Sequence, residues 1–264
     1  MQEKTERFPI LRVTEQDTSR IEDAVVSEYS LTIFLSNQEL VTLFCSPTDL
    51  KHLAVGFLFS EGLIKGKGDI KEIVVDDQRG VVRAVIEEDK GLASELVVKR
   101  LVTSGGGRGA FFSGAPDARG HSKVKSEIEV SPPTVFALMN QFVQCSELFK
   151  ATGGVHSAAL CDTEGILVFK EDVGRHNAID KIFGECILRD IPTADRIVLT
   201  SGRISSEIVL KVAKRNIPIL ISKAAPTNVG VKLAADLDIT LIGFVRGRRM
   251  NVYTHDWRVA ANGK

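Results

Sequence analysis

The sequence of 264 residues lacks several features that would assign its class at once. Its four cysteines, Cys45, Cys145, Cys161 and Cys186, lie far apart, so neither a disulfide framework nor a zinc knuckle is indicated. No run approaches the ~18 uninterrupted apolar residues of a membrane span, and the first residues contain no apolar run typical of a secretory signal. We therefore expect a cytoplasmic protein that does not engage a membrane.

The chain also lacks net charge. It has 34 Lys and Arg against 34 Asp and Glu, which gives a formal net charge of +0 at pH 7. Without a general field to attract a polyanion, we expect no nucleic-acid partner, and any anion must bind at a local cluster. A hydrophobic content of 44% with 26% charged residues is sufficient for a packed core.

Several enzyme patterns are missing. There is no P-loop and no Gly-x-Ser-x-Gly nucleophile elbow. A zinc deaminase needs His-x-Glu followed by Pro-Cys-x-x-Cys, but His156 is followed by Ser and Ala, and no cysteine pair exists. A nucleophilic Ser201 served by a remote histidine has no support from spacing. A zinc or serine hydrolase is therefore disfavoured.

The first half reads as a small α+β unit. Alternating apolar residues predict a hairpin from residues 31–35 and 41–45, and an apolar stripe predicts a helix from Leu50 that closes at Gly62. Two further β runs, 73–75 and 81–86, follow. The glycine-rich residues 103–125 predict a mobile loop or linker, so we expect domains at 1–125 and 126–264.

The second half alternates strands and helices. Ser131 followed by two prolines opens a helix, and a hairpin follows from strands at 155–160 and 166–169. The rest is predicted, in order, as helix 176–188, strand 197–200, helix 205–214, strand 217–221, helix 227–237 and strand 239–245. Such alternation predicts a parallel sheet between helix layers.

Hydroxyl and basic residues gather where the predicted strands end. Ligands of open α/β sheets bind outside the carboxyl ends of the strands, and arginine forks match phosphate oxygens. The predicted anion-binding rim consists of Ser201, Gly202, Arg203, Lys223, Thr227, Phe244, Val245, Arg246, Gly247, Arg248 and Arg249. The alternative for the last four residues alone is a solvated surface run of charge.

A second cluster flanks the predicted hairpin strands: His156, Ser157, Asp172, Arg175 and His176. These side chains could bind a ligand or perform acid–base chemistry. The alternative is that Asp172 caps the following helix and His176 makes a buried contact. We expect His156 and Arg175 to line the same pocket as Arg246.

Six ordered motifs resemble the FdhD family of formate dehydrogenase accessory proteins. They are EDVGRHNAIDK at 171–181, TGGVHSAA at 152–159, TSGRISSE at 200–207, AAPT at 224–227, GFVRGRRMNVY at 243–253 and AVGFLFSEG at 54–62. The resemblance runs from about residue 30 to the C-terminus.

The resemblance implies a fold, partners and a cargo. The fold would be α/β, with a cytidine-deaminase-like three-layer α/β/α domain and a smaller N-terminal α+β domain, in a homodimer. Such proteins take sulfur from a cysteine desulfurase and pass it to the molybdenum (or tungsten) bis-guanine-dinucleotide cofactor of formate dehydrogenase. The residues at 244–249 would bind that cofactor, and no tightly bound metal of the protein's own is implied.

One departure from the family affects the sulfur relay. The family relays sulfur through Cys-x-x-Cys, but here that segment reads TSGGGRG at 103–109, with Gly106 and Gly109 at the cysteine positions. A persulfide requires a thiolate, which glycine cannot supply. Cys161, predicted in the hairpin turn near His156, is the thiol to test, since the other three are expected to be buried. Two functions therefore remain open for this protein, a sulfur carrier and a noncatalytic cofactor-binding chaperone.

Overall fold

The computed structural model describes residues 2–87, 100–102 and 122–260, with the backbone alone for 100–102. Its elements are β1 Thr5–Val13, β2 Thr18–Val26, β3 Tyr29–Leu35, β4 Gln38–Cys45, α1 Leu50–Ser60, the 3₁₀ turn η1 Lys67–Asp69, β5 Ile70–Asp76, β6 Val81–Ile86, β7 Arg100–Val102, α3 Pro132–Cys145, α4 Glu147–Thr152, β8 His156–Cys161, β9 Ile166–Asp172, α5 Arg175–Leu188, β10 Ile197–Thr200, α6 Ser206–Lys214, β11 Ile219–Ser222, α7 Asn228–Asp236, β12 Thr240–Arg246, β13 Arg249–Thr254 and the 3₁₀ turn η2 Asp256–Arg258.

The larger sheet is mixed rather than wholly parallel. Its six strands follow the order β13-β12-β11-β10-β8-β9. Strands β10, β11 and β12 are parallel, as predicted, but β8 pairs antiparallel with β10, and β13 pairs antiparallel with β12. A tight turn at Gly247, whose φ is 58°, returns the chain as β13, an element that the helix–strand alternation did not predict.

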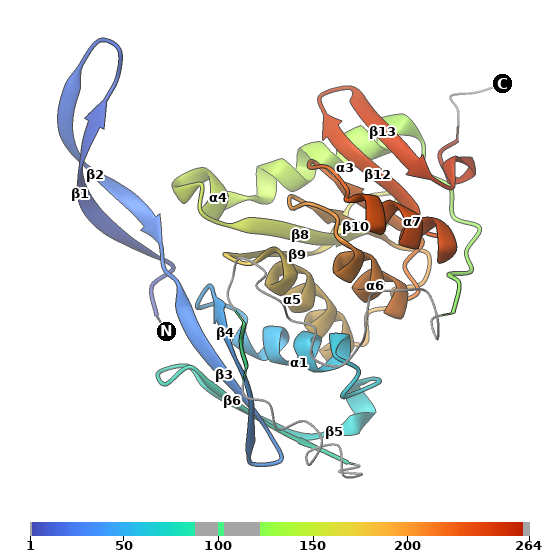
Figure 1. Ribbon diagram of the computed structural model, residues 1–264, viewed down its shortest axis with the longest axis horizontal. Coiled ribbons are helices and arrows are strands. Elements are labelled where there is room, and N and C mark those ends of the chain that lie inside the picture. The colour runs from blue at the N-terminus through green and yellow to red at the C-terminus, as the bar shows by residue number, and fades with distance from the viewer. Residues whose placement is uncertain (1, 88–99, 103–121, 261–264) are drawn as a thin grey trace.

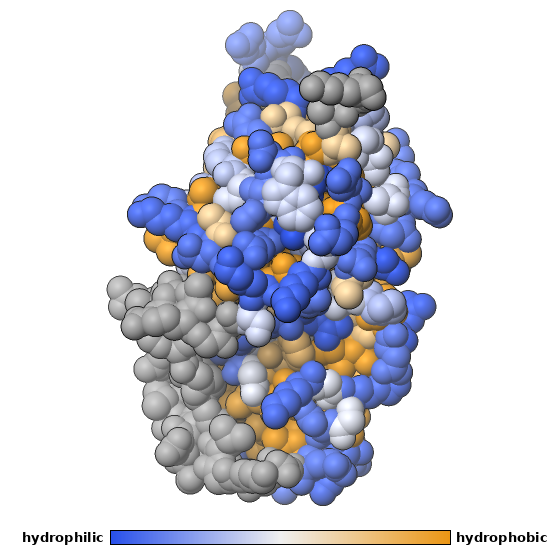
Figure 2. Space-filling model, turned by 90° about the vertical axis from the view of Figure 1, so that its right-hand side faces the viewer, coloured by the Kyte–Doolittle hydropathy of each residue, from blue (hydrophilic) through white to orange (hydrophobic). Residues whose placement is uncertain are grey.

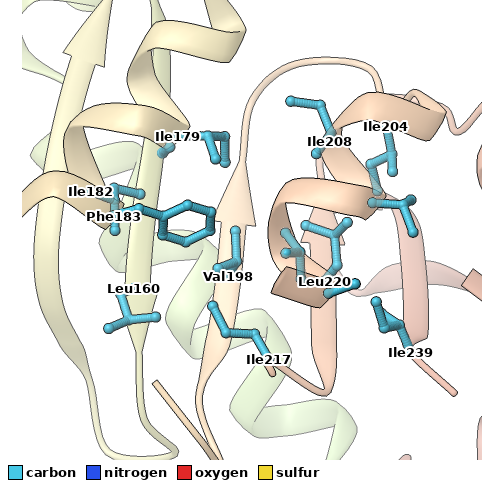
Figure 3. Close-up of a cluster of buried hydrophobic side chains, with 14 of the residues drawn as sticks. Leu160, Ile179, Ile182, Phe183, Val198, Ile204, Ile208, Ile217, Leu220 and Ile239 are labelled. Atoms are coloured by element: carbon cyan, nitrogen blue, oxygen red, sulfur yellow. The ribbon is translucent and has the colours of Figure 1, made fainter. Parts of the chain in front are cut away.

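The layers can be followed in Figure 1, where α3 lies above the larger sheet and α5, α6 and α7 lie below it. Below the sheet, Ile179, Ile182 and Phe183 of α5 point toward Leu160 and Val198 of the strands (Figure 3). Burying such side chains contributes roughly 1.5–3 kcal/mol each. On the other face, residues of α3 pack with strand residues in a second core, so the sheet is covered on both faces, as an α/β architecture requires.

The smaller sheet has five strands in the order β5-β6-β3-β4-β7. The predicted β3–β4 hairpin, the helix α1 and the β5–β6 pair are all present. Helix α1 packs on this sheet, and Ile187 of α5 completes the same core. The two units therefore meet through α1 and α5.

An N-terminal hairpin was not predicted. Strands β1 and β2 pair along their whole length and project from the body (Figure 1). The strand signal is weak because Pro9 interrupts it and charged residues occur on both faces. The base of the hairpin contacts the body where Val26 lies against Gly154.

The surface mixes polar and apolar residues. On the face shown in Figure 2, hydrophilic residues dominate the upper part and hydrophobic residues show among them below. The predicted glycine-rich loop, including Gly106 and Gly109, lies outside the described residues except for 122–125. Within that remainder, Val124 packs in the core of the larger unit.

Two glycines set the distance between α1 and α5. A Cβ atom at Gly184 would lie 1.8 Å from the backbone oxygen of His52, and one at Gly56 would lie 1.8 Å from that of Asp180. No side chain fits at such distances, so each helix presents a glycine to the backbone of the other.

We predict that Gly184→Ala lowers the free energy of unfolding by about 1–3 kcal/mol, because the helices must separate. Urea denaturation would measure the loss. Gly68→Ala is the control, since a Cβ there would meet nothing within 4 Å. Equal stability of the two variants would contradict the close helix contact.

Candidate functional site

A pocket of about 800 Å³ opens at the end of the larger sheet where the parallel strands finish. Because β8 is antiparallel to β10, its first residue lies at this same end, where His156 pairs with Asp172. The pocket is lined by Met139, Asn140, Phe142, Val143, Ser146, Phe149, Gly153, Gly154, Val155, His156, Ser157, Val173, Ser201, Lys223, Ala224, Val245, Arg246 and Gly247.

Hydrogen bonds join the ends of β10 and β11, the loops that follow these two strands, and the end of β12. The Lys223 amide donates to the Thr200 oxygen (3.3 Å), and the Phe244 amide donates to the Ala224 oxygen (3.1 Å). The Ser222 hydroxyl donates to the Gly202 oxygen (2.7 Å). These cross-links hold the basic side chains of neighbouring strand ends in one place.

Phe244 has a left-handed backbone conformation, with φ at 54°. A bulky residue rarely adopts this conformation, which costs about 1–3 kcal/mol. The strain coincides with a shift of register between Gly243 and Arg246, where β12 bulges against β13. The bulge redirects the residues that follow, and Val245 and Arg246 line the pocket.

His156 and Ser201 form the polar centre of the pocket. The Ser201 hydroxyl oxygen accepts from the Ser157 amide (2.9 Å) and lies 3.2 Å from His156 Nδ1. Burial lowers the pKa of His156, and the neighbouring Arg175 and Arg203 lower it further. The lowered pKa favours the neutral imidazole, which can form a hydrogen bond with a bound group.

The structure gathers seven of the predicted site residues in the pocket: His156, Ser157, Ser201, Lys223, Val245, Arg246 and Gly247. It places the others outside the lining: Asp172, Arg175, His176, Gly202, Arg203, Thr227, Phe244, Arg248 and Arg249. The hydroxyl of Thr227 accepts from the Gly230 amide and caps α7.

Arg175 does not line the pocket, contrary to the expectation for it. Its stem packs over Gly202, where an added Cβ would lie 2.9 Å from Arg175 Cβ. Burial and the charge of Arg203 lower its pKa. Burial, and after it the positive charge of Lys211, holds the pKa of His176 well below the usual value. His176 Nε2 lies 3.3 Å from the Glu207 carboxylate. Of these two residues, Arg175 acts on His156, whose pKa its charge lowers.

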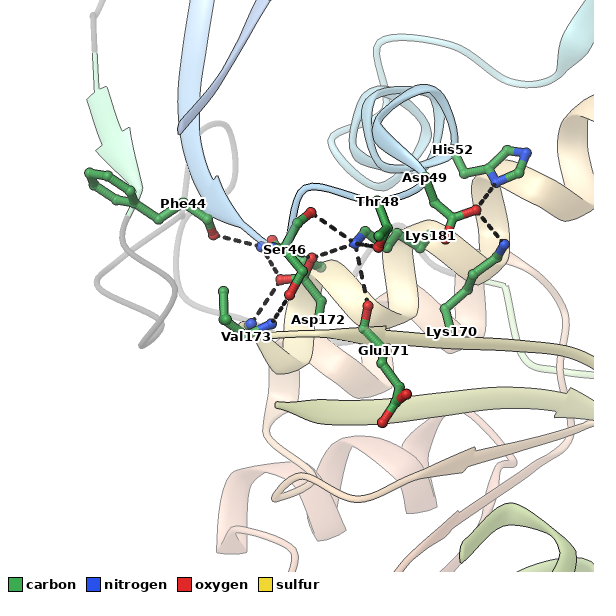
Figure 4. A network of polar contacts seen from close by, with 12 residues as sticks. Phe44, Ser46, Thr48, Asp49, His52, Lys170, Glu171, Asp172, Val173 and Lys181 are labelled. Atoms are coloured by element: carbon green, nitrogen blue, oxygen red, sulfur yellow. Dashed lines mark hydrogen bonds and ion pairs between the residues drawn. The ribbon is translucent and has the colours of Figure 1, made fainter. Parts of the chain in front are cut away.

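Asp172 is fully buried and anchors two segments instead of facing a ligand. Its carboxylate accepts from the amides of Ser46 (3.0 Å) and Gly174 (2.8 Å) and lies 2.6 Å from Lys181 Nζ. Figure 4 shows this network beside the contact of Lys170 with Asp49. The alternative that Asp172 caps the following helix is wrong, because the N-cap of α5 is Gly174 and no side chain caps it. Asp172 accepts the amide of Gly174 just before the helix begins.

The sequence did not predict that α3 and α4 form one wall of the pocket. Met139, Asn140, Val143 and Phe149 line the pocket, yet in the sequence the apolar ones read as the buried stripe of a helix. Helical periodicity does not distinguish an apolar residue that faces a core from one that faces a pocket. No signal in this single sequence marks Asn140.

The cysteines differ from expectation in two respects. Cys161 ends β8, at the opposite end of that strand from His156, and burial raises its pKa to about 12. Cys45 and Cys186 are buried too, with pKa values raised to about 12 and about 11. Cys145, expected to be buried, is exposed at the end of α3. Cys161 is therefore a poor thiol to test.

The described part of the chain shows neither a membrane-spanning helix nor a cluster of metal ligands. None of its helices is long and apolar enough to cross a membrane. No group of three or more His, Cys, Asp or Glu residues there could hold a metal ion.

The fold and site define an α/β protein with a basic and partly apolar pocket at the strand ends of its larger sheet. The model of the FdhD/NarQ family matches residues 26–260, and the chain belongs to that family. A crystal structure from Desulfotalea psychrophila, described as a formate dehydrogenase accessory protein, superimposes with a TM-score of 0.81 at 25% identity, covering 98% of this chain and 100% of that one.

Two relatives are named sulfur carrier protein FdhD. The protein of Bacillus subtilis (strain 168) is 42% identical over 250 residues, which is 95% of each chain. The protein of Staphylococcus aureus (strain MRSA252) is 38% identical over 251 residues, again 95% of each chain.

We predict that Lys181→Met lowers the free energy of unfolding by about 3–5 kcal/mol, because it leaves the Asp172 carboxylate buried without its cation. Adding Asp172→Asn should recover part of the loss by removing the stranded charge. Chemical denaturation of both single variants and the double variant measures the coupling. Strictly additive losses would show that the two side chains do not stabilise one another.

Proposed function

We propose that this chain is a cytoplasmic, homodimeric accessory protein of formate dehydrogenase that binds the molybdenum (or tungsten) bis-guanine-dinucleotide cofactor in the pocket at the strand ends. Its larger unit would have the cytidine-deaminase-like three-layer arrangement that the motifs imply. The names of the relatives and of the similar crystal structure support the accessory role.

The observation that carries the proposal is the convergence of Lys223, Arg246 and His156 on one pocket. Cationic side chains suit the pyrophosphates of a dinucleotide cofactor. The apolar residues of the same pocket suit its flat rings. The cofactor is the cargo of the protein, and its metal and pterin would carry the redox chemistry of the client enzyme.

The sulfur step is a second function, favoured by the names of the relatives. In it, a cysteine desulfurase would load sulfur onto a thiol of this chain for transfer to the cofactor. Glycine occupies both relay positions, and Cys45, Cys161 and Cys186 are buried with raised pKa values. These facts favour a cofactor-binding chaperone, with the exposed Cys145 as the remaining thiol.

We predict that Arg246→Ala weakens GDP binding roughly tenfold or more, because a charged hydrogen bond to phosphate contributes ~1.5–3 kcal/mol. Isothermal titration calorimetry on the full chain measures the affinity. Lys232→Ala is the control, since it removes one positive charge from the exposed side of α7 and does not line the pocket. Unchanged affinity in the Arg246 variant would exclude this site.

We further predict that wild type accepts no sulfur from a cysteine desulfurase, whereas the double variant Gly106→Cys/Gly109→Cys does. Mass spectrometry of the intact chain detects the added sulfur atom, and GDP binding by both proteins serves as the control for folding. A persulfide on Cys145 of wild type would instead establish a carrier with a different thiol. A folded but unloaded double variant would contradict the placement of the relay positions.

A further inference from the structure

The pocket has two chemically different walls. The strand ends supply its polar and cationic wall, with His156, Lys223 and Arg246. Helices α3 and α4 supply the other, with Met139, Asn140, Val143, Phe149 and neighbouring residues. Phosphate groups can account for the first wall but leave the second without a role.

The second wall exposes apolar groups that the core does not use. Val143 is 37% exposed and Phe149 is 44% exposed, whereas Leu138 and Phe142 of the same helical segment are buried. An exposed valine and an exposed aromatic ring beside one pocket offer an apolar contact for a flat ring.

This wall is held in place before any ligand arrives. The Glu171 carboxylate accepts from the amides of Leu148 and Phe149, each at 3.0 Å, which ties the start of α4 to β9. The Ser146 hydroxyl donates to the Phe142 oxygen and lies 3.0 Å from the Ser157 hydroxyl. The position of Phe149 is therefore set by the same strands that present the cationic wall.

Asn140 is the exposed polar side chain of this wall, whereas Ser146 is buried and already hydrogen-bonded. Asn140 lies three residues before Val143, so both share one face of α3. Its side chain is exposed and makes no hydrogen bond to another residue in the described part of the chain. An amide offers both donors and an acceptor, which the edge of a nucleobase can use.

We propose that the α3–α4 wall is the base-binding half of the pocket. Phe149 and Val143 contact the face of a purine base, and Asn140 hydrogen-bonds its edge while the phosphates lie at the strand ends. This rests on the proposed function, because the base belongs to the guanine nucleotide of the cofactor. Asn140 is then a specificity-determining residue.

Calorimetry with GDP on the full chain tests the assignment. Asn140→Ala should weaken GDP binding roughly two- to tenfold, as expected for one neutral hydrogen bond. Phe149→Ala should weaken it roughly fivefold or more through lost stacking. The matched control is Gln141→Ala, which removes an α3 amide that lies near Gly165 and does not line the pocket; its affinity should be unchanged.

A spectroscopic readout separates stacking from a structural effect. In Phe149→Trp the introduced indole should be quenched when GDP binds, against the constant emission of Trp257, the one native tryptophan. A variant that binds GDP by calorimetry without quenching would overturn the proposal. So would Asn140 and Phe149 variants with wild-type GDP affinity while Arg246→Ala still weakens binding. If wild type binds no GDP, the proposed function itself fails.

Discussion

The buried ion pair between Asp172 and Lys181 fixes the relation of the two units of this protein. Both side chains are inaccessible to solvent, and burying either charge alone would cost several kcal/mol. The pair is tolerated because Lys181 Nζ also lies 3.3 Å from the oxygens of Ser46 and Glu171, while Asp172 accepts backbone amides. The network therefore forms only when the β4–α1 connection of the smaller unit meets the end of β9 and the start of α5.

The pocket depends on this junction indirectly, through strand β9. The end of β9 that carries Asp172 also carries Glu171, whose carboxylate holds the start of α4, and the strand pairs with His156. On α5, Asp180 accepts from the Ser60 hydroxyl of α1 (2.6 Å) and pairs with Lys211 of α6. Polar contacts thus clamp α5 between α1 and α6, while glycines allow the helices to approach.

The sequence predicted the parts of the structure that follow local rules. The ends of β10, β11 and β12 come together because parallel strands finish at one edge, which placed Ser201, Lys223 and Arg246 correctly. The β1–β2 hairpin escaped prediction because its apolar pattern is broken, and the α3–α4 wall because its residues look like core. Gly106 and Gly109 fall outside the described residues, so their assignment to the relay positions stays a prediction from the sequence.

A chain without net charge can still present a positive pocket, because its carboxylates are used elsewhere. Among the residues that the structure describes, no Asp or Glu lines the pocket. Two acids of the adjoining strand β9 are already engaged, Glu171 by the amides of α4 and Asp172 by Lys181. Within the described residues neither Lys223 nor Arg246 forms an ion pair. The carboxylates that hold the fold together thereby leave two cations unneutralised at the strand ends, where a local field attracts an anion that the net charge would not.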